Sequence, residues 1–224
     1  MLNPRQAVAQ VVLDHSECAE VFRRHHIDFC CQGELSLEEA ARRRQVKLEE
    51  LLKELEQRIA ERREPAGVDP RTLSTAELVD FLKTRYHEPL RRGLPFALAL
   101  AKKVSRVHGA HNPSLVELEQ AVTELADALE AHLDDEEQEL FAHLGTPAPE
   151  RAGVQRLLGA MAGEHLALTA LLQRVRAASD GFTLPDWACN SYRTLFSELE
   201  NLERDVSAQV HLEQHVLRPR FLEG

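Results

Sequence analysis

Three side chains that can bind a metal ion stand two residues apart near the end of the chain, in the segment DVSAQVHLEQHVLRPR. They are His211, Glu213 and His215. On one α-helix a step of two residues turns the chain by about 200°, so the three side chains cannot all face the same side. If Glu213 faces the interior of the protein, the two histidines face outward.

The apolar residues of this segment indicate which side is buried. Alternating steps of four and three residues, the spacing of a helix face in the core of a bundle, connect Leu195, Leu199, Leu202, Val206, Gln209, Glu213 and Val216. His211 and His215 do not share this spacing. The pattern therefore predicts that Gln209 and Glu213 point inward and that both histidines lie on the outer surface.

Three earlier segments have the same spacing, and each interrupts its apolar residues with polar ones. Their inward positions are His87, Leu90, Leu94, Ala97, Ala101, Val104 and His108 in the first, Leu118, Val122, Leu125, Leu129, His132 and Glu136 in the second, and Val154, Leu158, Met161, His165, Leu168, Leu172 and Val175 in the third. The second and the last segments are interrupted in the same phase, each by two residues four apart. Such a pair lies on one helix face, one turn apart.

These inward polar residues allow two interpretations. A single histidine on an apolar face is usually satisfied by a hydrogen bond within the protein. A buried carboxylate costs several kcal/mol unless it is paired or bound to a metal. Two inward carboxylates and three inward histidines on neighbouring helices therefore favour a metal site. Helix bundles hold paired iron or manganese in this way, with carboxylates that bridge two ions and imidazoles at the outer positions.

The composition indicates the elements that would position these residues. Hydrophobic residues make up 43% of the 224-residue chain, charged residues 29% and aromatic residues 5%, which is typical of an all-helical globular protein. Helical patterns run roughly over residues 74–108, 114–144, 150–178 and 185–217, with glycine and proline at their joints. Four helices of about 30 residues with short connections predict an antiparallel four-helix bundle.

A smaller helical domain is expected before the bundle. Residues 1–62 contain two helical stretches separated by the segment DFCCQGE, and Ser36 followed by Glu39 resembles a capping box. Residues 63–72, which contain proline and glycine, are the expected linker, and residues 73–224 form the expected bundle domain. The first domain is small for an independent core. We therefore expect it to pack on the rest of the chain or on a second subunit, which would give a homodimer.

Charge and motifs exclude several classes of function. A net charge of −10 argues against nucleic acid as a partner, because phosphate binding depends on clustered Lys and Arg. The sequence contains no signal-peptide pattern and no apolar stretch of the roughly 18 residues needed to cross a membrane, which predicts a cytoplasmic protein. No Ser-His-Asp signature or glycine-rich phosphate loop is apparent. The sequence thus gives little support for acid–base or nucleophilic catalysis and leaves open whether the protein is an enzyme.

The four cysteines are expected to be thiols. Cys30 and Cys31 are adjacent, and neighbouring cysteines bridge only through a strained ring. In a cytoplasmic chain a disulfide framework is also uncommon.

Several motifs together resemble a known family, the repair of iron centres or ScdA-type di-iron proteins. The resemblance covers nearly the whole chain. Its N-terminal part rests on DFCCQGELSLEEAA, and its bundle part on RYHEPLRRGLP, KKVSRVH, HLDDEEQELF, MAGEHLAL and HLEQHVLRPR. The resemblance implies a small N-terminal domain followed by a hemerythrin-like four-helix domain that holds two non-haem irons.

The same resemblance implies a role for individual residues. His87, His132 and His165 match terminal iron ligands, and Glu136 and Glu213 match the carboxylates that bridge the irons.

His108 matches a further histidine of the family motif. It is 21 residues from His87, about 31 Å along a straight helix, so both reach one centre only if the helix breaks. The alternative for His108 is a residue at a helix end that interacts with the last carbonyls.

The last helix departs from the family at Gln209, where the family has a histidine four residues before the glutamate. An amide oxygen is a poorer iron ligand than an imidazole. One metal position is therefore expected to be weak or empty, which suits an iron donor and equally suits a site that has decayed.

The resemblance implies repair of iron–sulfur clusters after oxidative or nitrosative damage, with iron–sulfur proteins as iron acceptors. In that function Cys30 and Cys31 would bind the transferred iron or exchange electrons with the centre; otherwise they are ordinary packed thiols. One alternative is a hemerythrin-like sensor or carrier of dioxygen or nitric oxide. Another is a bundle with one metal or none.

Overall fold

The computed structural model describes residues 2–61, 68–146 and 150–222. The predicted all-α class is confirmed: apart from an isolated antiparallel bridge between Ala7 and Ser36, the described residues contain no β-structure. The chain divides into two compact units, Met1–Thr72 with Val210–Val216, and Leu73–Gln209 with Leu217–Gly224.

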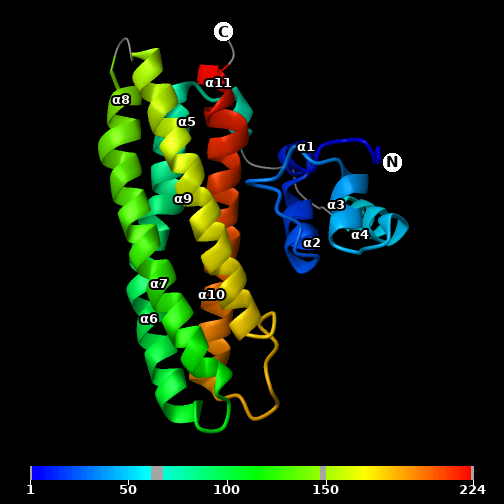
Figure 1. The fold of residues 1–224 in the computed structure, drawn as a ribbon, viewed down its shortest axis with the longest axis vertical. Coiled ribbons are helices and arrows are strands. Elements are labelled where there is room, and N and C mark those ends of the chain that lie inside the picture. Colours follow the sequence, from blue (N-terminus) through cyan, green and yellow to red (C-terminus); the bar gives the residue numbers. More distant parts are fainter. Residues whose placement is uncertain (1, 62–67, 147–149, 223–224) are drawn as a thin grey trace. The chain divides into compact units, whose positions relative to one another are not determined.

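Long helices that run in alternating directions make up the second unit (Figure 1). Its elements are α5 (Thr75–Leu82), η3 (Lys83–His87), α6 (Glu88–His108), α7 (Ser114–Asp135), η4 (Glu136–Phe141), α8 (Ala142–Leu144), α9 (Arg151–Ala178), α10 (Asn190–Leu212), η5 (Glu213–Leu217) and α11 (Pro219–Leu222). Val210–Val216, which span the end of α10 and most of η5, are the part of this last helix counted with the first unit. The predicted four-helix bundle is present, and its last helix begins at Asn190 rather than near residue 185.

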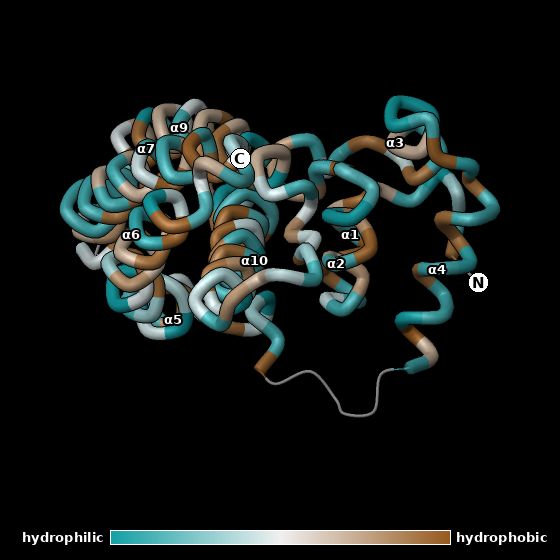
Figure 2. Tube along the Cα trace, turned by 90° about the horizontal axis from the view of Figure 1, so that it is seen from below, coloured by the Kyte–Doolittle hydropathy of each residue, from teal (hydrophilic) through white to brown (hydrophobic). Residues whose placement is uncertain are grey.

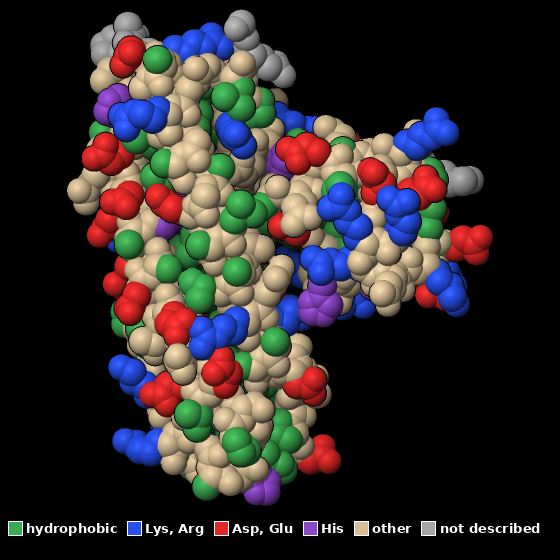
Figure 3. All heavy atoms as spheres, viewed as in Figure 1, with side chains coloured by type: hydrophobic (Ala, Val, Ile, Leu, Met, Phe, Trp, Pro, Cys, Tyr) green, Lys and Arg blue, Asp and Glu red, His purple; other side chains and the backbone are tan. Residues whose placement is uncertain are grey.

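The core of the bundle follows the predicted 4-3 spacing. Every apolar residue named above for the four inward faces is buried, and so are His87, His132, Glu136, His165, Gln209 and Glu213. Figure 2, seen along the bundle, shows α6, α7, α9 and α10 grouped around a common axis. Figure 3 shows acidic and basic side chains interspersed over the outer face. The burial pattern supports the interpretation that the polar residues on the inward faces belong to one interior site.

Three of the four bundle helices contain a π-helical turn. These turns are η3, which ends at His87, η4, which begins at Glu136, and η5, which begins at Glu213. A π turn adds one residue to the helical repeat and often marks a functional site. The sequence pattern did not predict these turns, yet each begins or ends at a candidate metal ligand.

The first unit consists of short helices and one stretch of the last helix. Its elements are α1 (Val8–Asp14), η1 (Ser16–Cys18), α2 (Ala19–Arg24), α3 (Leu37–Arg43), α4 (Leu48–Glu61) and η2 (Pro70–Thr72). The predicted capping box is confirmed at the start of α3, where the Ser36 hydroxyl accepts a hydrogen bond from the Glu39 backbone N–H at 3.2 Å. The carboxylate of Glu39 accepts in return from the Ser36 N–H.

The expected linker, residues 63–72, is described from residue 68 onward. Residues 63–67 of the expected linker lie outside the described residues, and the rest of it includes η2. Among the helices that the structure describes, none is both long and apolar enough to cross a membrane.

Candidate metal centre

Two groups of buried side chains present metal-binding atoms to one another. One group is His132, His165 and Glu213, and the other is His87, Glu136 and Glu213; within each group the ligand atoms lie within 4.8 Å of one another. Glu213 belongs to both groups. The imidazoles of His132 and His165 meet edge to face, with ring centroids 4.9 Å apart. Imidazole and carboxylate are the donors that iron, manganese and zinc sites in proteins use.

A carboxylate outside the group orients His87. Nδ1 of His87 lies 2.9 Å from Oε1 of Glu137. Burial by itself would raise the pKa of Glu137, but its hydrogen bonds to His87 and Arg91 and the charge of Arg91 lower it below the usual value. An ionised carboxylate only accepts hydrogen bonds, so Nδ1 of His87 carries the hydrogen and Nε2 presents its lone pair toward the group.

His132 has the same kind of partner. Its Nδ1 lies 2.7 Å from Oε2 of Glu164, which projects from α9. A histidine that binds a metal almost always donates its other ring N–H to such a group, which fixes the tautomer and the ring orientation. The residues present therefore fit a metal centre in their immediate donors and also in the carboxylates behind them.

Sequence reasoning missed Glu137 and Glu164. Glu137 directly follows Glu136, and Glu164 directly precedes His165. Both lie outside the 4-3 spacing that identified the inward faces. The signal that was available is a second carboxylate beside a candidate ligand, in the segments DEEQ and GEHL.

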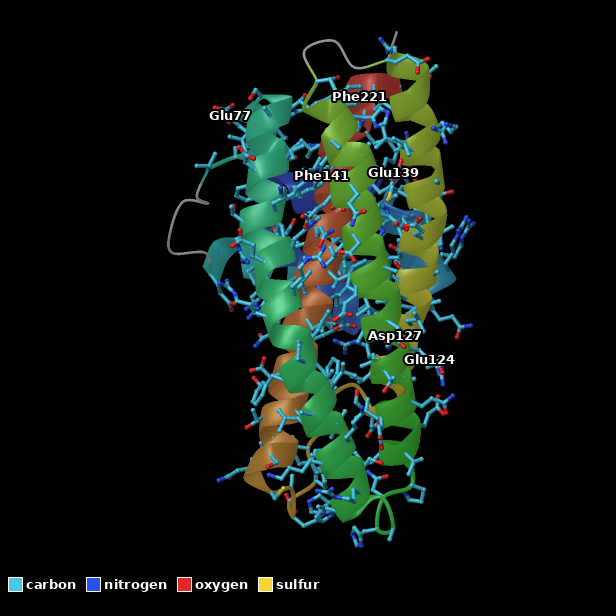
Figure 4. All side chains as sticks on the ribbon, turned by 90° about the vertical axis from the view of Figure 1, so that its left-hand side faces the viewer. Glu77, Glu124, Asp127, Glu139, Phe141 and Phe221 are labelled. Atoms are coloured by element: carbon cyan, nitrogen blue, oxygen red, sulfur yellow. The ribbon has the colours of Figure 1, made fainter. Side chains whose placement is uncertain are left out.

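Phe141 closes one side of the group formed by His87, Glu136 and Glu213, which is called the His87 position below. Its ring stacks on the imidazole of His87 with a centroid distance of 5.4 Å. Figure 4 shows Phe141 and Glu139 on the segment that contains η4, turned to different sides of it. The buried Phe141 thus lies on the inner side, whereas Glu139 is exposed.

Gln209 lies in the interior with the second group. Its Nε2 is 3.1 Å from Nε2 of His87 and 3.3 Å from Oε2 of Glu136. The predicted inward direction of Gln209 therefore agrees with its surroundings.

The structure does not bring His108 to these residues, which corrects the expectation that it joins the site. The helix from Glu88 to His108 is continuous despite Pro95, so the break that His108 would need is absent from α6. The imidazole of His108 instead contacts the side chains of Trp187 and Cys189, with Nε2 3.3 Å from the Cys189 Sγ.

His211 and His215 also require a correction. Both lie outside the two groups, as predicted, but His211 is not on the surface: only 3% of it is exposed. Its Nδ1 lies 3.2 Å from the carbonyl oxygen of Phe29, and Nε2 of His215 lies 2.8 Å from that of Cys30. The sequence pattern identified the side of the helix but not the first-unit segment that covers it.

The Cys30–Cys31 pair lies in a tight loop that a carboxylate stabilises. Oδ1 of Asp28 accepts hydrogen bonds from the backbone N–H groups of Cys30 and Cys31, at 3.0 and 2.8 Å. Cys30 is buried, and burial raises the pKa of its thiol well above the usual value, whereas Cys31 is partly exposed. At Gly33 an added Cβ would lie 2.5 Å from the Phe29 carbonyl oxygen, so the loop requires glycine there.

Comparison with known proteins places the chain in a family. Residues 78–221 match the model of the hemerythrin HHE cation binding domain, and residues 4–59 match ScdA_N, a domain of unknown function also called DUF542. The chain belongs to the hemerythrin HHE family. In this family member, the matched range contains both groups of candidate metal ligands.

Relatives of this hemerythrin-family chain share its full length. It is 32% identical to the iron–sulfur cluster repair protein YtfE of Citrobacter koseri, across 98% of this chain and 97% of the relative. YtfE of an Enterobacter species is 31% identical over the same shares, and the iron–sulfur cluster repair protein ScdA of Staphylococcus haemolyticus is 28% identical over 99% and 100%. The similarity therefore covers the N-terminal domain as well as the bundle.

Proposed function

We propose that this protein holds two non-haem irons and donates iron for the repair of iron–sulfur clusters damaged by oxidative or nitrosative stress. The observation that carries the proposal is the pair of buried ligand groups that share Glu213. The repair function is supported by the relatives, whose names describe iron–sulfur cluster repair and which match this chain over nearly its whole length.

The contacts support a division of roles among the ligands. His87 would bind one iron, and His132 and His165 would bind the other. Glu213 is common to both groups and would hold both irons. Oε2 of Glu136 lies 3.4 Å from Nε2 of His87 and 3.8 Å from Nε2 of His132, which supports Glu136 as the second bridge.

When bound, the two irons would be redox-active ions that an acceptor protein can take up. The chain's own residues prepare the site for them. Glu137 and Glu164 hold two imidazoles with their coordinating nitrogens facing the centre. Buried Leu129, Leu168 and Val206 occupy the next inward positions along their helices and keep bulk water from that side.

The Cys30–Cys31 pair is proposed to take part in transfer, either by binding iron as it leaves or by exchanging electrons with the centre. Cys31 is the more accessible of the two thiols. A thiolate is a good ligand for iron in transit, because soft sulfur donors also bind iron in clusters. Reduced thiols require a reducing compartment, which agrees with a cytoplasmic place of action.

The direct test is transfer of iron to an apo iron–sulfur protein. Protein purified without added metal is loaded with Fe²⁺ under anaerobic conditions and mixed with the acceptor, sulfide and thiol reductant. We expect cluster absorbance to appear faster than with the same amount of Fe²⁺ in the presence of metal-free protein. Equal rates would contradict the donor function.

The same preparation separates the alternatives. A reversible optical change with dioxygen or nitric oxide, without transfer to the acceptor, would instead favour a sensor or carrier. Metal analysis that finds one ion or none per chain would contradict the di-iron proposal.

Light scattering of the purified protein tests the homodimer expected from the small N-terminal domain.

A further inference from the structure

The amide of Gln209 occupies the place of a ligand atom in the His87 position. Nε2 of Gln209, Nε2 of His87 and Oε2 of Glu136 form a triangle with sides of 3.1, 3.3 and 3.4 Å. Around an ion bound at about 2.0–2.2 Å, neighbouring ligand atoms lie roughly 3.0–3.4 Å apart. The three atoms therefore have the spacing of adjacent corners of one coordination shell.

The neighbours of Gln209 determine which end of its amide faces them. In the neutral imidazole that a metal ligand must be, Nε2 of His87 is the lone-pair nitrogen, because Nδ1 carries the hydrogen that points to Glu137. The carboxylate oxygen of Glu136 is also an acceptor. Both therefore take hydrogen bonds from the NH₂ group of Gln209, and an NH₂ group has no lone pair available for a metal. The other end of the amide, Oε1, is fully buried and has no hydrogen-bond partner among the described residues.

We propose that Gln209 is an exchangeable ligand that makes the His87 position the one from which metal is released. Without metal there, its NH₂ group bonds to His87 and Glu136 and holds the two ligand atoms together. When metal enters, these two hydrogen bonds break and the amide rotates, so that Oε1 becomes a ligand. When metal leaves the position, the NH₂ group forms its hydrogen bonds to His87 and Glu136 again, so both buried ligand atoms keep a polar contact.

The two positions therefore differ in affinity. Binding at the His87 position must break two internal hydrogen bonds that involve Gln209, and it gains an amide oxygen rather than an imidazole. The first ion accordingly enters the group of His132, His165 and Glu213. This inference rests on the proposed iron-donor function only in one respect: the second ion to bind is the one that is passed on.

Anaerobic titration with Fe²⁺ tests the inequality. We expect wild-type protein to bind two ions in separate steps, the second at least tenfold weaker than the first. Gln209→Glu removes the NH₂ donor and offers an oxygen without rotation, whereas Gln209→His offers a ring nitrogen. Each variant should bind the second ion at least tenfold more tightly than the wild type. The affinity for the first ion should change less than twofold. Gln120→Glu, at an exposed position of α7, adds the same charge elsewhere and should change neither step.

The amide rotation has its own signature in the wild-type protein, which does not depend on the metal affinity of the variants. In ¹⁵N-labelled wild-type protein, one side-chain NH₂ pair that is missing from the spectrum of Gln209→His belongs to Gln209. With Zn²⁺ as a diamagnetic probe, this pair should stay in place through the first equivalent and shift during the second.

The outcomes of these experiments separate the exchange from the function. Equal binding steps in the wild type, or a Gln209 signal that moves with the first equivalent, would overturn the exchange. Unequal steps with the expected Gln209 shift, but no delivery of iron to an acceptor, would leave the exchange standing and contradict only the donor function.

Discussion

Nδ1 of His132 and Oε2 of Glu164 lie 2.7 Å apart and join α7 to α9 at the level of the metal ligands. His87 and Glu137 repeat the arrangement at 2.9 Å between η3 and η4. Each contact leaves the opposite ring nitrogen as the coordinating atom. The site is thus preorganised by residues that would never touch the metal.

Replacing Glu164 with Gln should weaken metal binding by about 10- to 100-fold, because a neutral amide orients and polarises His132 less strongly. Titration with Fe²⁺ measures the change. Glu130→Gln, at an exposed position of the same helix as His132, serves as the control. Equal metal affinities for the two variants would mean that the contact of Glu164 with His132 does not support metal binding.

Glu136→Ala should lose most of the bound metal, because this carboxylate lies near both His87 and His132. Metal analysis after purification gives the stoichiometry. The matched control is Glu139→Ala, an exposed position on the same π turn. Two ions per chain in Glu136→Ala would remove this residue from the proposed ligands.

His211→Ala should lower the free energy of unfolding of the metal-free protein by roughly 2 kcal/mol, because it removes a buried ring and its hydrogen bond to the Phe29 carbonyl. Urea unfolding measures the loss. His143→Ala, at an exposed position on α8, should stay within about 0.5 kcal/mol of the wild type. If both variants unfold alike, the contact seen at Phe29 contributes no stability.

The double variant Cys30→Ser with Cys31→Ser should keep the metal stoichiometry of the wild type, since neither cysteine belongs to a ligand group. It should deliver iron more slowly to an apo iron–sulfur acceptor, because a hydroxyl is a much weaker iron ligand than a thiolate. Cys189→Ser, an exposed thiol on the bundle unit, is the control. Wild-type transfer by the double variant would leave the pair with a packing role alone.

Cys18 should make the protein less stable in alkali. Burial, and then the charge of Glu17, raise the pKa of its thiol from 9.0 to about 12. A raised pKa stabilises the fold below the unfolded value, and that contribution is lost as pH rises from about 9 toward 12. Between pH 7.5 and 10 the wild type should lose about 1.4 kcal/mol more than Cys18→Ala, as measured by urea unfolding at both values. Parallel losses would show that the thiol ionises equally in the folded and unfolded chain.

The 4-3 spacing was sufficient to predict the bundle and the inward direction of the candidate ligands, because a helix that packs in a bundle core repeats its buried face. It placed Gln209 and Glu213 inside without any knowledge of the partner helices. Their burial in the structure agrees with that prediction.

The same spacing could not predict contacts that depend on tertiary structure. Glu164 is on the flank of α9, and only the position of α7 brings it to His132. His211 looked like a surface residue because nothing in its own helix indicates the Phe29 carbonyl that covers it. His108 has the spacing of an inward residue, yet a continuous α6 keeps it away from the ligand groups.

The three π turns at the ligands have a consequence for changes in chain length. Each turn holds one residue more than a regular helical turn, so deleting that residue would restore a regular α-helical turn. A deletion within η3, η4 or η5 would therefore keep the inward faces in phase but change the backbone around the ligand at that turn. Whole seven-residue repeats added or removed far from these turns preserve the phase. Redesign of this bundle should accordingly tolerate a longer or shorter apolar end but no insertion or deletion beside the metal ligands.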